Sequence, residues 1–213
     1  MKGTFITFEG IDSCGKSIQL ELLAQKIVNH HKSLSIIREP GGTPVAENIR
    51  TLLLDNTEES MSPATELLLF SAARAQLVEQ KISPLLDSDH FILCDRFYDS
   101  TTAYQGYGRG IDIEFIQRLN DFASHGIKPD ITFLFDISVK EMNIRMLKNE
   151  IKADRMESES KLFFERVRQG FLKIANDNPD RFVVLDGHKP IKDIEENIWN
   201  YFRSKYLQGG EYV

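Results

Sequence analysis

The sequence contains no apolar run near the roughly 20 residues that a membrane-spanning helix requires. Its first residues, MKGTFITFEG, lack the long apolar stretch and small-residue cleavage site of a secretory signal peptide. It has two cysteines, Cys14 in a glycine-rich loop and Cys94 in an apolar run, which is too few for a disulfide framework. We therefore expect a cytoplasmic protein with reduced thiols and no membrane partner.

Positive charge is also scarce. The chain carries 26 Lys and Arg against 32 Asp and Glu, which gives a formal net charge of -6. A protein that grips nucleic acid needs a basic surface, so we expect no nucleic-acid partner, and a DNA-repair ATPase is disfavoured. The five histidines show no spacing typical of metal ligands or of a general base.

What the sequence does contain is an alternation of short apolar runs with longer segments of helical period, the pattern of an α/β fold. Its 213 residues, 41% of them hydrophobic, predict one domain over 1–213. The expected strands are TFITF (4–8), LSIIR (34–38), FILCD (91–95), ITFLFD (131–136) and RFVVLD (181–186). The expected helices cover 17–31, 65–82, 113–126, 139–149, 161–176 and 191–206. Nearly continuous apolar strands are typical of a parallel sheet covered on both faces.

The stretch GIDSCGKS, from Gly10 to Ser17, follows the first strand and precedes a helix, and it matches the P-loop pattern G-x-x-x-x-G-K-[ST]. Glycines let backbone N–H groups surround phosphate oxygens, and the helix N-terminus adds positive charge. Lys16 is expected to reach the β- and γ-phosphates, and Ser17 to help hold Mg²⁺. The predicted ATP-binding residues are Gly10, Ile11, Asp12, Ser13, Cys14, Gly15, Lys16, Ser17 and Ile18.

Four further motifs follow the P-loop: REPGGT (38–43), FSAARAQ (70–76), DRFYDSTTAYQG (95–106) and DRMESES (154–160). Their order and spacing resemble the thymidylate kinase family of the bacterial type over nearly the full chain. The resemblance implies a P-loop NTPase three-layer fold with a five-stranded parallel sheet, helices on both faces and a short lid. It also implies transfer of the γ-phosphoryl group of ATP to dTMP, giving dTDP and ADP for dTTP biosynthesis, by a homodimer.

Asp95 and Arg96 end a predicted strand, where ligands of open parallel sheets bind. The carboxylate could hold a magnesium-bound water, and the guanidinium could bridge the donor and acceptor phosphates. The family resemblance implies roles for further residues in binding dTMP. Arg38 would clamp the monophosphate, Phe70 and Arg74 would contact the base, Thr101 and Gln105 would line the thymine site, Tyr104 would close on the sugar, and Asp12 would meet the 3′-hydroxyl.

The polar segment at about 149–160 fits a lid that closes over ATP and excludes water. Some family members carry an arginine among the variable P-loop positions, whereas this chain has Ile11 to Cys14 there. Arg155 in the lid is therefore the candidate catalytic arginine, beside Lys16 and Arg96. Ser13, Cys14 and Ile18 depart from the residues usual in the family, and the loss of a hydroxyl at Ile18 puts one phosphate contact in doubt.

Two other functions remain open on the residues alone. The chain could be another P-loop kinase that acts on a nucleoside, a different monophosphate or another small molecule. It could also be a non-enzymatic NTP-binding switch, although it lacks the N-K-x-D motif with which GTPases read guanine. The segment GYGRGID (106–112) is expected to be a glycine-rich connection, with Asp112 capping the next helix.

Overall fold

The computed structural model describes residues 3–55, 60–148 and 154–207. A five-stranded parallel sheet forms its centre, in the order β2-β3-β1-β4-β5. The strands are β1 (Thr4–Glu9), β2 (Leu34–Arg38), β3 (Phe91–Asp95), β4 (Ile131–Asp136) and β5 (Phe182–Asp186). All five strands predicted from the sequence are confirmed within one residue at each end. Strand β1 lies between β3 and β4, so the P-loop that follows β1 is at a switch point of the sheet.

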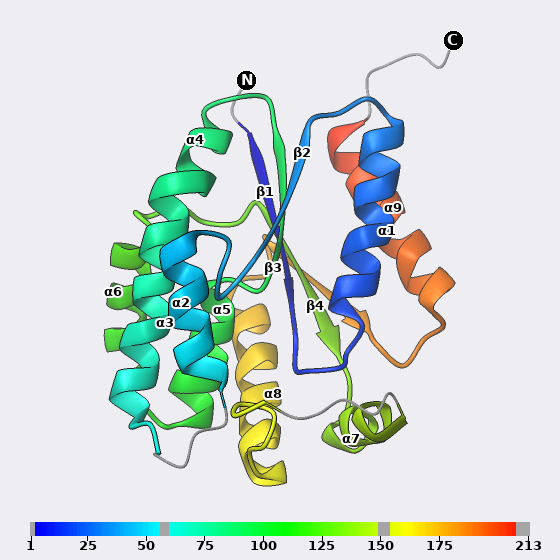
Figure 1. Ribbon diagram of the computed structural model, residues 1–213. Coiled ribbons are helices and arrows are strands. Elements are labelled where there is room, and N and C mark those ends of the chain that lie inside the picture. Colours follow the sequence, from blue (N-terminus) through cyan, green and yellow to red (C-terminus); the bar gives the residue numbers. More distant parts are fainter. Residues whose placement is uncertain (1–2, 56–59, 149–153, 208–213) are drawn as a thin grey trace.

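Helices cover both faces of this sheet (Figure 1). On one face lie α1 (Lys16–Asn29) and α9 (Ile191–Tyr206), which pack on each other. The other face carries α3 (Pro63–Leu77), the π-helical η1 (Val78–Ile82), α4 (Ser83–Leu86), α6 (Ile113–Ala123) and α8 (Lys161–Asp177). The three-layer α/β arrangement is therefore confirmed. None of the helices that the structure describes is both long and apolar enough to cross a membrane.

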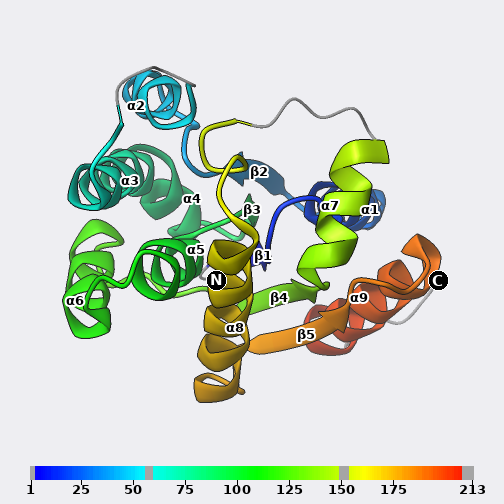
Figure 2. The same cartoon turned by 90° about the horizontal axis from the view of Figure 1, so that it is seen from below.

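The carboxyl ends of the strands meet at one edge of the sheet, where the remaining elements gather (Figure 2). They are α2 (Pro44–Leu54), α5 (Tyr98–Thr101), the π-helical η2 (Thr102–Gly108) and α7 (Val139–Lys148), which lies in front of α1 in this view. Residues 154–160 form turns between α7 and α8. The remainder of the predicted lid, 149–153, lies outside the described residues.

Helix α2 is not among the helices predicted from the sequence. Its start nevertheless carries a recognisable signal. Thr43 is the N-cap and its hydroxyl accepts a hydrogen bond from the Ala46 N–H at 3.2 Å, Pro44 occupies the first turn, and Glu47 follows as the acidic first-turn residue. Gly41 and Gly42 directly before this signal are typical of a loop, so the start of the helix was not recognised.

The expectation of a glycine-rich connection at 106–112 was wrong in its first half, because η2 continues to Gly108. Packing favours glycine at Gly106 and Gly108. A Cβ on Gly106 would come within 2.6 Å of the Ile113 side chain, and one on Gly108 within 2.6 Å of the Phe163 ring. The glycines thus let η2 lie tightly against α6 and α8. The Asp112 cap is confirmed, since its carboxylate accepts from the Phe115 N–H at 2.8 Å.

Candidate active site

The P-loop joins β1 to α1 and has the backbone that a phosphate cradle requires. Gly10 and Gly15 have positive φ angles of 141° and 101°, which side chains rarely tolerate. Ser13 also has a positive φ of 55°, which gives a physical reason why a glycine would suit that position. The Lys16 ammonium is buried and donates to the carbonyl oxygens of Gly10 (3.2 Å) and Ile11 (3.0 Å). Its charge is therefore held over the loop that would surround a phosphate.

Ser17, in the first turn of α1, lies against the end of β3. Its hydroxyl donates to Asp95 Oδ2 at 2.8 Å. Hydroxyl and carboxylate oxygens are ligands that suit Mg²⁺, which keeps several waters and takes few protein ligands. The pair predicted from sequence as the magnesium site is thus brought together, and its donor atoms fit the ion.

A cavity of about 200 Å³ opens beside the P-loop at the carboxyl ends of β2 and β3. All eight residues predicted to bind the acceptor line it: Asp12, Arg38, Phe70, Arg74, Arg96, Thr101, Tyr104 and Gln105. Asp95 lines it as well. Sequence reasoning missed several residues of its wall, among them Glu39, Arg50, Ser100, Met156 and Glu157.

Arg96 stands at the centre of the polar contacts in this cavity. Its guanidinium pairs with the Asp12 carboxylate and donates to the Gly10 carbonyl at 2.8 Å and to the Ser100 hydroxyl at 3.1 Å. The Tyr104 hydroxyl donates to the other Asp12 oxygen at 2.8 Å. Burial opposes the charge of Asp12, but Arg96 and Lys16 outweigh it and lower the pKa of that carboxyl. Asp12 therefore remains an anion that can accept from a sugar hydroxyl.

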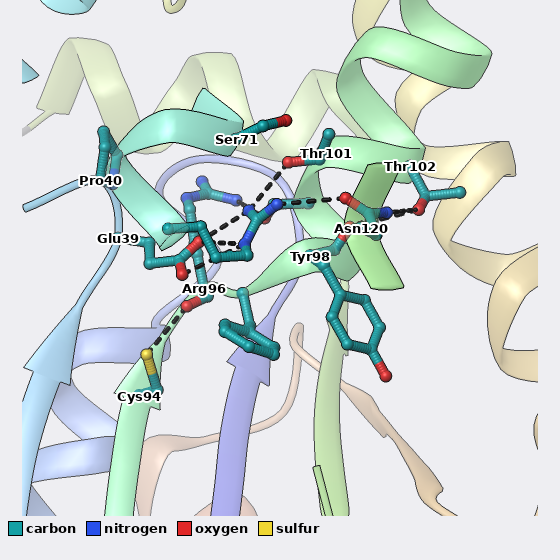
Figure 3. Close-up of polar contacts among 12 residues, drawn as sticks. Glu39, Pro40, Ser71, Cys94, Arg96, Tyr98, Thr101, Thr102 and Asn120 are labelled. Atoms are coloured by element: carbon teal, nitrogen blue, oxygen red, sulfur yellow. Dashed lines mark hydrogen bonds and ion pairs between the residues drawn. The ribbon is translucent and has the colours of Figure 1, made fainter. Parts of the chain in front are cut away.

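Arg74 is fully buried. Its partners Glu39, Thr101 and Asn120, which are labelled in Figure 3, come from the loop after β2, from α5 and from α6. Glu39 accepts from its Nε at 2.9 Å and from its Nη2 at 2.7 Å, while Thr101 and Asn120 accept at 2.9 and 3.1 Å. Burial raises the pKa of Glu39, and the charge and hydrogen bonds of Arg74 offset this effect only in part. These contacts use four of the five guanidinium N–H groups. One N–H of Nη1 has no partner among the described residues and can meet a ligand.

Two of the predicted arginines form ion pairs with carboxylates that do not line the cavity. Arg38 is half-exposed and pairs with Glu47 at 2.9 Å. Arg155 donates to Glu66 Oε2 at 2.7 Å and to the Leu53 carbonyl at 2.7 Å, and it is not among the residues that line the cavity. Its catalytic role stays a prediction that requires an exchange of these contacts.

Arg145 in α7 is a further arginine that sequence reasoning missed. It donates to the Gly187 carbonyl at 2.8 Å and approaches the Ser13 and Cys14 carbonyls at 3.4 Å. The side chain thus bridges the P-loop and the turn after β5. Its only sequence signal was its place on a helix after the fourth strand.

Glu9 supports the turn that presents Arg96, whose φ of 68° is unusual for a non-glycine residue. The buried carboxyl accepts from the Phe97 N–H at 2.7 Å and from the Ser100 hydroxyl at 2.6 Å. Burial and the neighbouring Asp99 raise its pKa to about 8, against the lowering by Ser100, Arg96 and Phe97. Glu9 is therefore a proton-binding group in the folded state.

This proton gives a pH-dependent stability. Between the ordinary pKa of 4.5 and about 8, the folded chain holds a proton at Glu9 that the unfolded chain has released. Its contribution therefore lowers the free energy of unfolding as pH rises through that window. We expect the melting temperature of Glu9→Gln to fall less between pH 5 and pH 8 than that of the unaltered protein. Glu196→Gln, at an exposed position on α9, is the control and should follow the unaltered curve; equal slopes for all three would contradict the assignment.

Comparisons with known proteins show which family the chain belongs to. The family model described as "Thymidylate kinase" matches residues 8–198. The chain is 45% identical to the thymidylate kinase of Geotalea uraniireducens (strain Rf4), over 97% of this chain and all of that protein. It is 44% identical to the thymidylate kinase of Thermoanaerobacter sp. (strain X514), with the same coverage. The crystal structure of thymidylate kinase from Ehrlichia chaffeensis superposes with a TM-score of 0.76 at 35% identity, covering 95% of this chain and 99% of that one. The match of the family model over most of the chain and the full-length similarity to thymidylate kinases show that this chain, with its P-loop and neighbouring cavity, belongs to the thymidylate kinase family.

Proposed function

We propose that the cavity beside Arg96 binds dTMP and that the P-loop binds ATP, so that the chain transfers the γ-phosphoryl group to dTMP and releases dTDP and ADP. The chain is a dTMP kinase by family. The observation that carries the site assignment is the gathering of Asp12, Arg74, Arg96 and Gln105 in one cavity at the edge of the P-loop.

The base would lie at the inner end of this cavity. Phe70 offers an aromatic face, and Arg74 keeps one N–H of Nη1 for a base carbonyl. Thr101 accepts from Arg74, so its own hydroxyl hydrogen can be donated to the ligand. A thymine ring presents two carbonyl acceptors and one N–H donor, which these groups can satisfy.

The acceptor phosphate would lie between Arg38 and Arg96. Arg50, which donates to the Pro40 carbonyl at 2.9 Å, adds a third positive charge to the same wall. Binding requires Arg38 to exchange Glu47 for the phosphate, and charge-assisted bonds to a dianion favour that exchange. Asp12 and Tyr104 would then face the sugar.

The phosphates of ATP would lie on the P-loop, with Lys16 over the β- and γ-phosphates. Ser17 and Asp95 are the residues that would hold Mg²⁺, which supplies positive charge to the phosphate oxygens when bound. The acceptor oxygen of dTMP is already anionic near neutral pH, so no general base is required. The residues of this chain therefore act by positioning and by charge stabilisation.

We also propose that residues 1–213 form one kinase domain in the cytoplasm and that two copies form a homodimer. Phe122 on α6 is 78% exposed and Leu68 on α3 is 57% exposed, and these two helices pack on each other. Apolar side chains on adjacent outer surfaces support a self-association face. Light scattering should give about twice 24.4 kDa, and Phe122→Glu should shift the mass toward one chain.

ADP formation from ATP and Mg²⁺ with single acceptors tests the function. We expect strong turnover with dTMP, weaker turnover with dUMP, and little above the acceptor-free background with CMP, GMP, AMP or thymidine. Preference for another acceptor would leave the P-loop assignment and remove the base contacts given to Phe70, Arg74, Thr101 and Gln105. Background rates with every acceptor would favour a nucleotide-binding switch.

A further inference from the structure

Glu66, in the first turn of α3, is a buried carboxylate that the phosphoryl transfer itself does not use. It is 1% exposed. Arg109 donates to it through Nε and Nη2 at 3.0 and 2.9 Å, Arg155 through Nη1 at 2.7 Å, and Gln105 through Nε2 at 2.9 Å. Three side chains from three parts of the chain therefore converge on one anion.

The contact with Gln105 fixes the orientation of an amide. An ionised carboxylate only accepts hydrogen bonds, so the NH₂ group of Gln105 must face Glu66. The amide carbonyl then points away from Glu66. It makes no hydrogen bond with the residues that the structure describes, and Gln105 lines the acceptor cavity.

Two arginines keep Glu66 ionised. Burial opposes its charge, but the bonds from Arg109, Gln105 and Arg155 outweigh burial and lower the pKa of the carboxyl. A neutral Glu66 could donate a hydrogen bond and would let the amide turn over. Arg109 is itself braced by Glu159 and lies 4.6 Å over the Phe163 ring, so the orientation is set by a packed cluster.

We infer that Glu66 is a positioning residue for base selectivity: by holding the Gln105 amide with its carbonyl toward the cavity, it makes the site accept a pyrimidine with N3–H and reject cytosine. This inference rests on the proposed function of the cavity as the dTMP site. Glu66 itself touches no substrate.

The hydrogen-bonding patterns of the bases explain the selectivity. Thymine and uracil present a carbonyl at C4 and an N–H at N3, which match the remaining Arg74 donor and the Gln105 acceptor. Cytosine presents an amino group at C4 and a lone pair at N3. The amino group would face the Arg74 N–H, donor against donor, and the N3 lone pair would face the Gln105 carbonyl, acceptor against acceptor. A turned amide at Gln105 would pair with cytosine N3 and penalise thymine.

The test is the ratio of kcat/KM for dTMP to kcat/KM for dCMP in Glu66→Gln. Its neutral amide can donate or accept, so Gln105 loses its fixed orientation while the volume is kept. We expect the ratio to fall by about tenfold or more, the usual scale of one mispaired hydrogen bond. Glu66→Asp keeps the negative charge but moves it back by one methylene, so it should lower the ratio less than Glu66→Gln. It is also the variant to measure if Glu66→Gln does not fold.

Two controls separate this role from general damage. Glu159→Gln loosens Arg109 without touching Gln105 and should leave the ratio unchanged. In a Gln105→Leu background, Glu66→Gln should not change the ratio further, because its route of action is gone. An unchanged ratio in both Glu66 variants, or an equal change in the controls, would overturn the inference. Failure of the unaltered protein to use dTMP would instead overturn the proposed function.

Discussion

Arg96→Ala is expected to lower kcat for dTMP phosphorylation by about 10³-fold, with a further loss in kcat/KM for dTMP. Arg96 is the guanidinium that meets both halves of the site, because it bonds the Gly10 carbonyl of the P-loop and faces the acceptor cavity. Losing a preorganised donor aimed at developing charge costs roughly 10²–10³ in rate, and losing a full positive charge costs at least as much.

The geometry explains why neighbouring groups cannot replace Arg96. The left-handed backbone at Arg96, braced by Glu9 through Phe97 and Ser100, directs the side chain across the P-loop. The guanidinium lies 5.2 Å over the Tyr104 ring and pairs with Asp12. Alanine would leave Asp12 beside the phosphates without its countercharge, so repulsion of the substrate adds to the lost attraction.

Two further variants, Arg96→Lys and Arg118→Ala, are compared with Arg96→Ala by steady-state kinetics. Lysine keeps the charge and loses the planar fork, so it should recover part of the rate. Arg118 is 70% exposed on α6 and pairs weakly with Glu114, so its alanine variant should match the unaltered enzyme. A kcat for Arg96→Ala within tenfold of the unaltered value would contradict a bridging role.

The strands were predictable because parallel strands between two helical layers must be apolar on both faces. FILCD and ITFLFD therefore stand out from any amphipathic segment, and β3 and β4 have the expected bounds. The region 98–108 was not predictable in the same way. Its helical turns contain Gly106 and Gly108, which local propensity assigns to a loop, and only packing against α6 and α8 explains them.

The site shows the same division. Lys16, Ser17, Asp95 and Arg96 follow directly from motifs at strand ends, and the structure brings them together. The carboxylates that hold the binding side chains in place lie far from them in sequence. Glu39 is 35 residues from Arg74, and Glu66 is 39 residues from Gln105. Buried pairs of this kind depend on tertiary packing, so no local sequence pattern predicts them.

Arg155→Ala provides the second large expected effect. If this arginine stabilises the transferring phosphoryl group when the lid closes, its removal should lower kcat by about 10³-fold and change the KM for ATP little. The side chain now rests on Glu66 and the Leu53 carbonyl and is 17% exposed. A phosphoryl group carries more charge than the shared Glu66 carboxylate, which also has Arg109, so the exchange favours the loaded site.

Comparison of Arg155→Ala with Glu66→Gln decides between a catalytic and an anchoring role. If Arg155 acts on the phosphates, Glu66→Gln, which releases it, should leave kcat for dTMP within a few-fold of the unaltered value. Arg155→Ala, which removes it, should lower kcat by the full factor of about 10³. If Arg155 only anchors residues 154–160 to α3, both variants should show the same modest loss, shared between kcat and KM. Because Arg109 and Gln105 still satisfy Glu66 when Arg155 leaves, the carboxylate is not orphaned by lid closure. In the proposed site, the same anion would hold Gln105 continuously and would hold Arg155 only until the phosphates are bound.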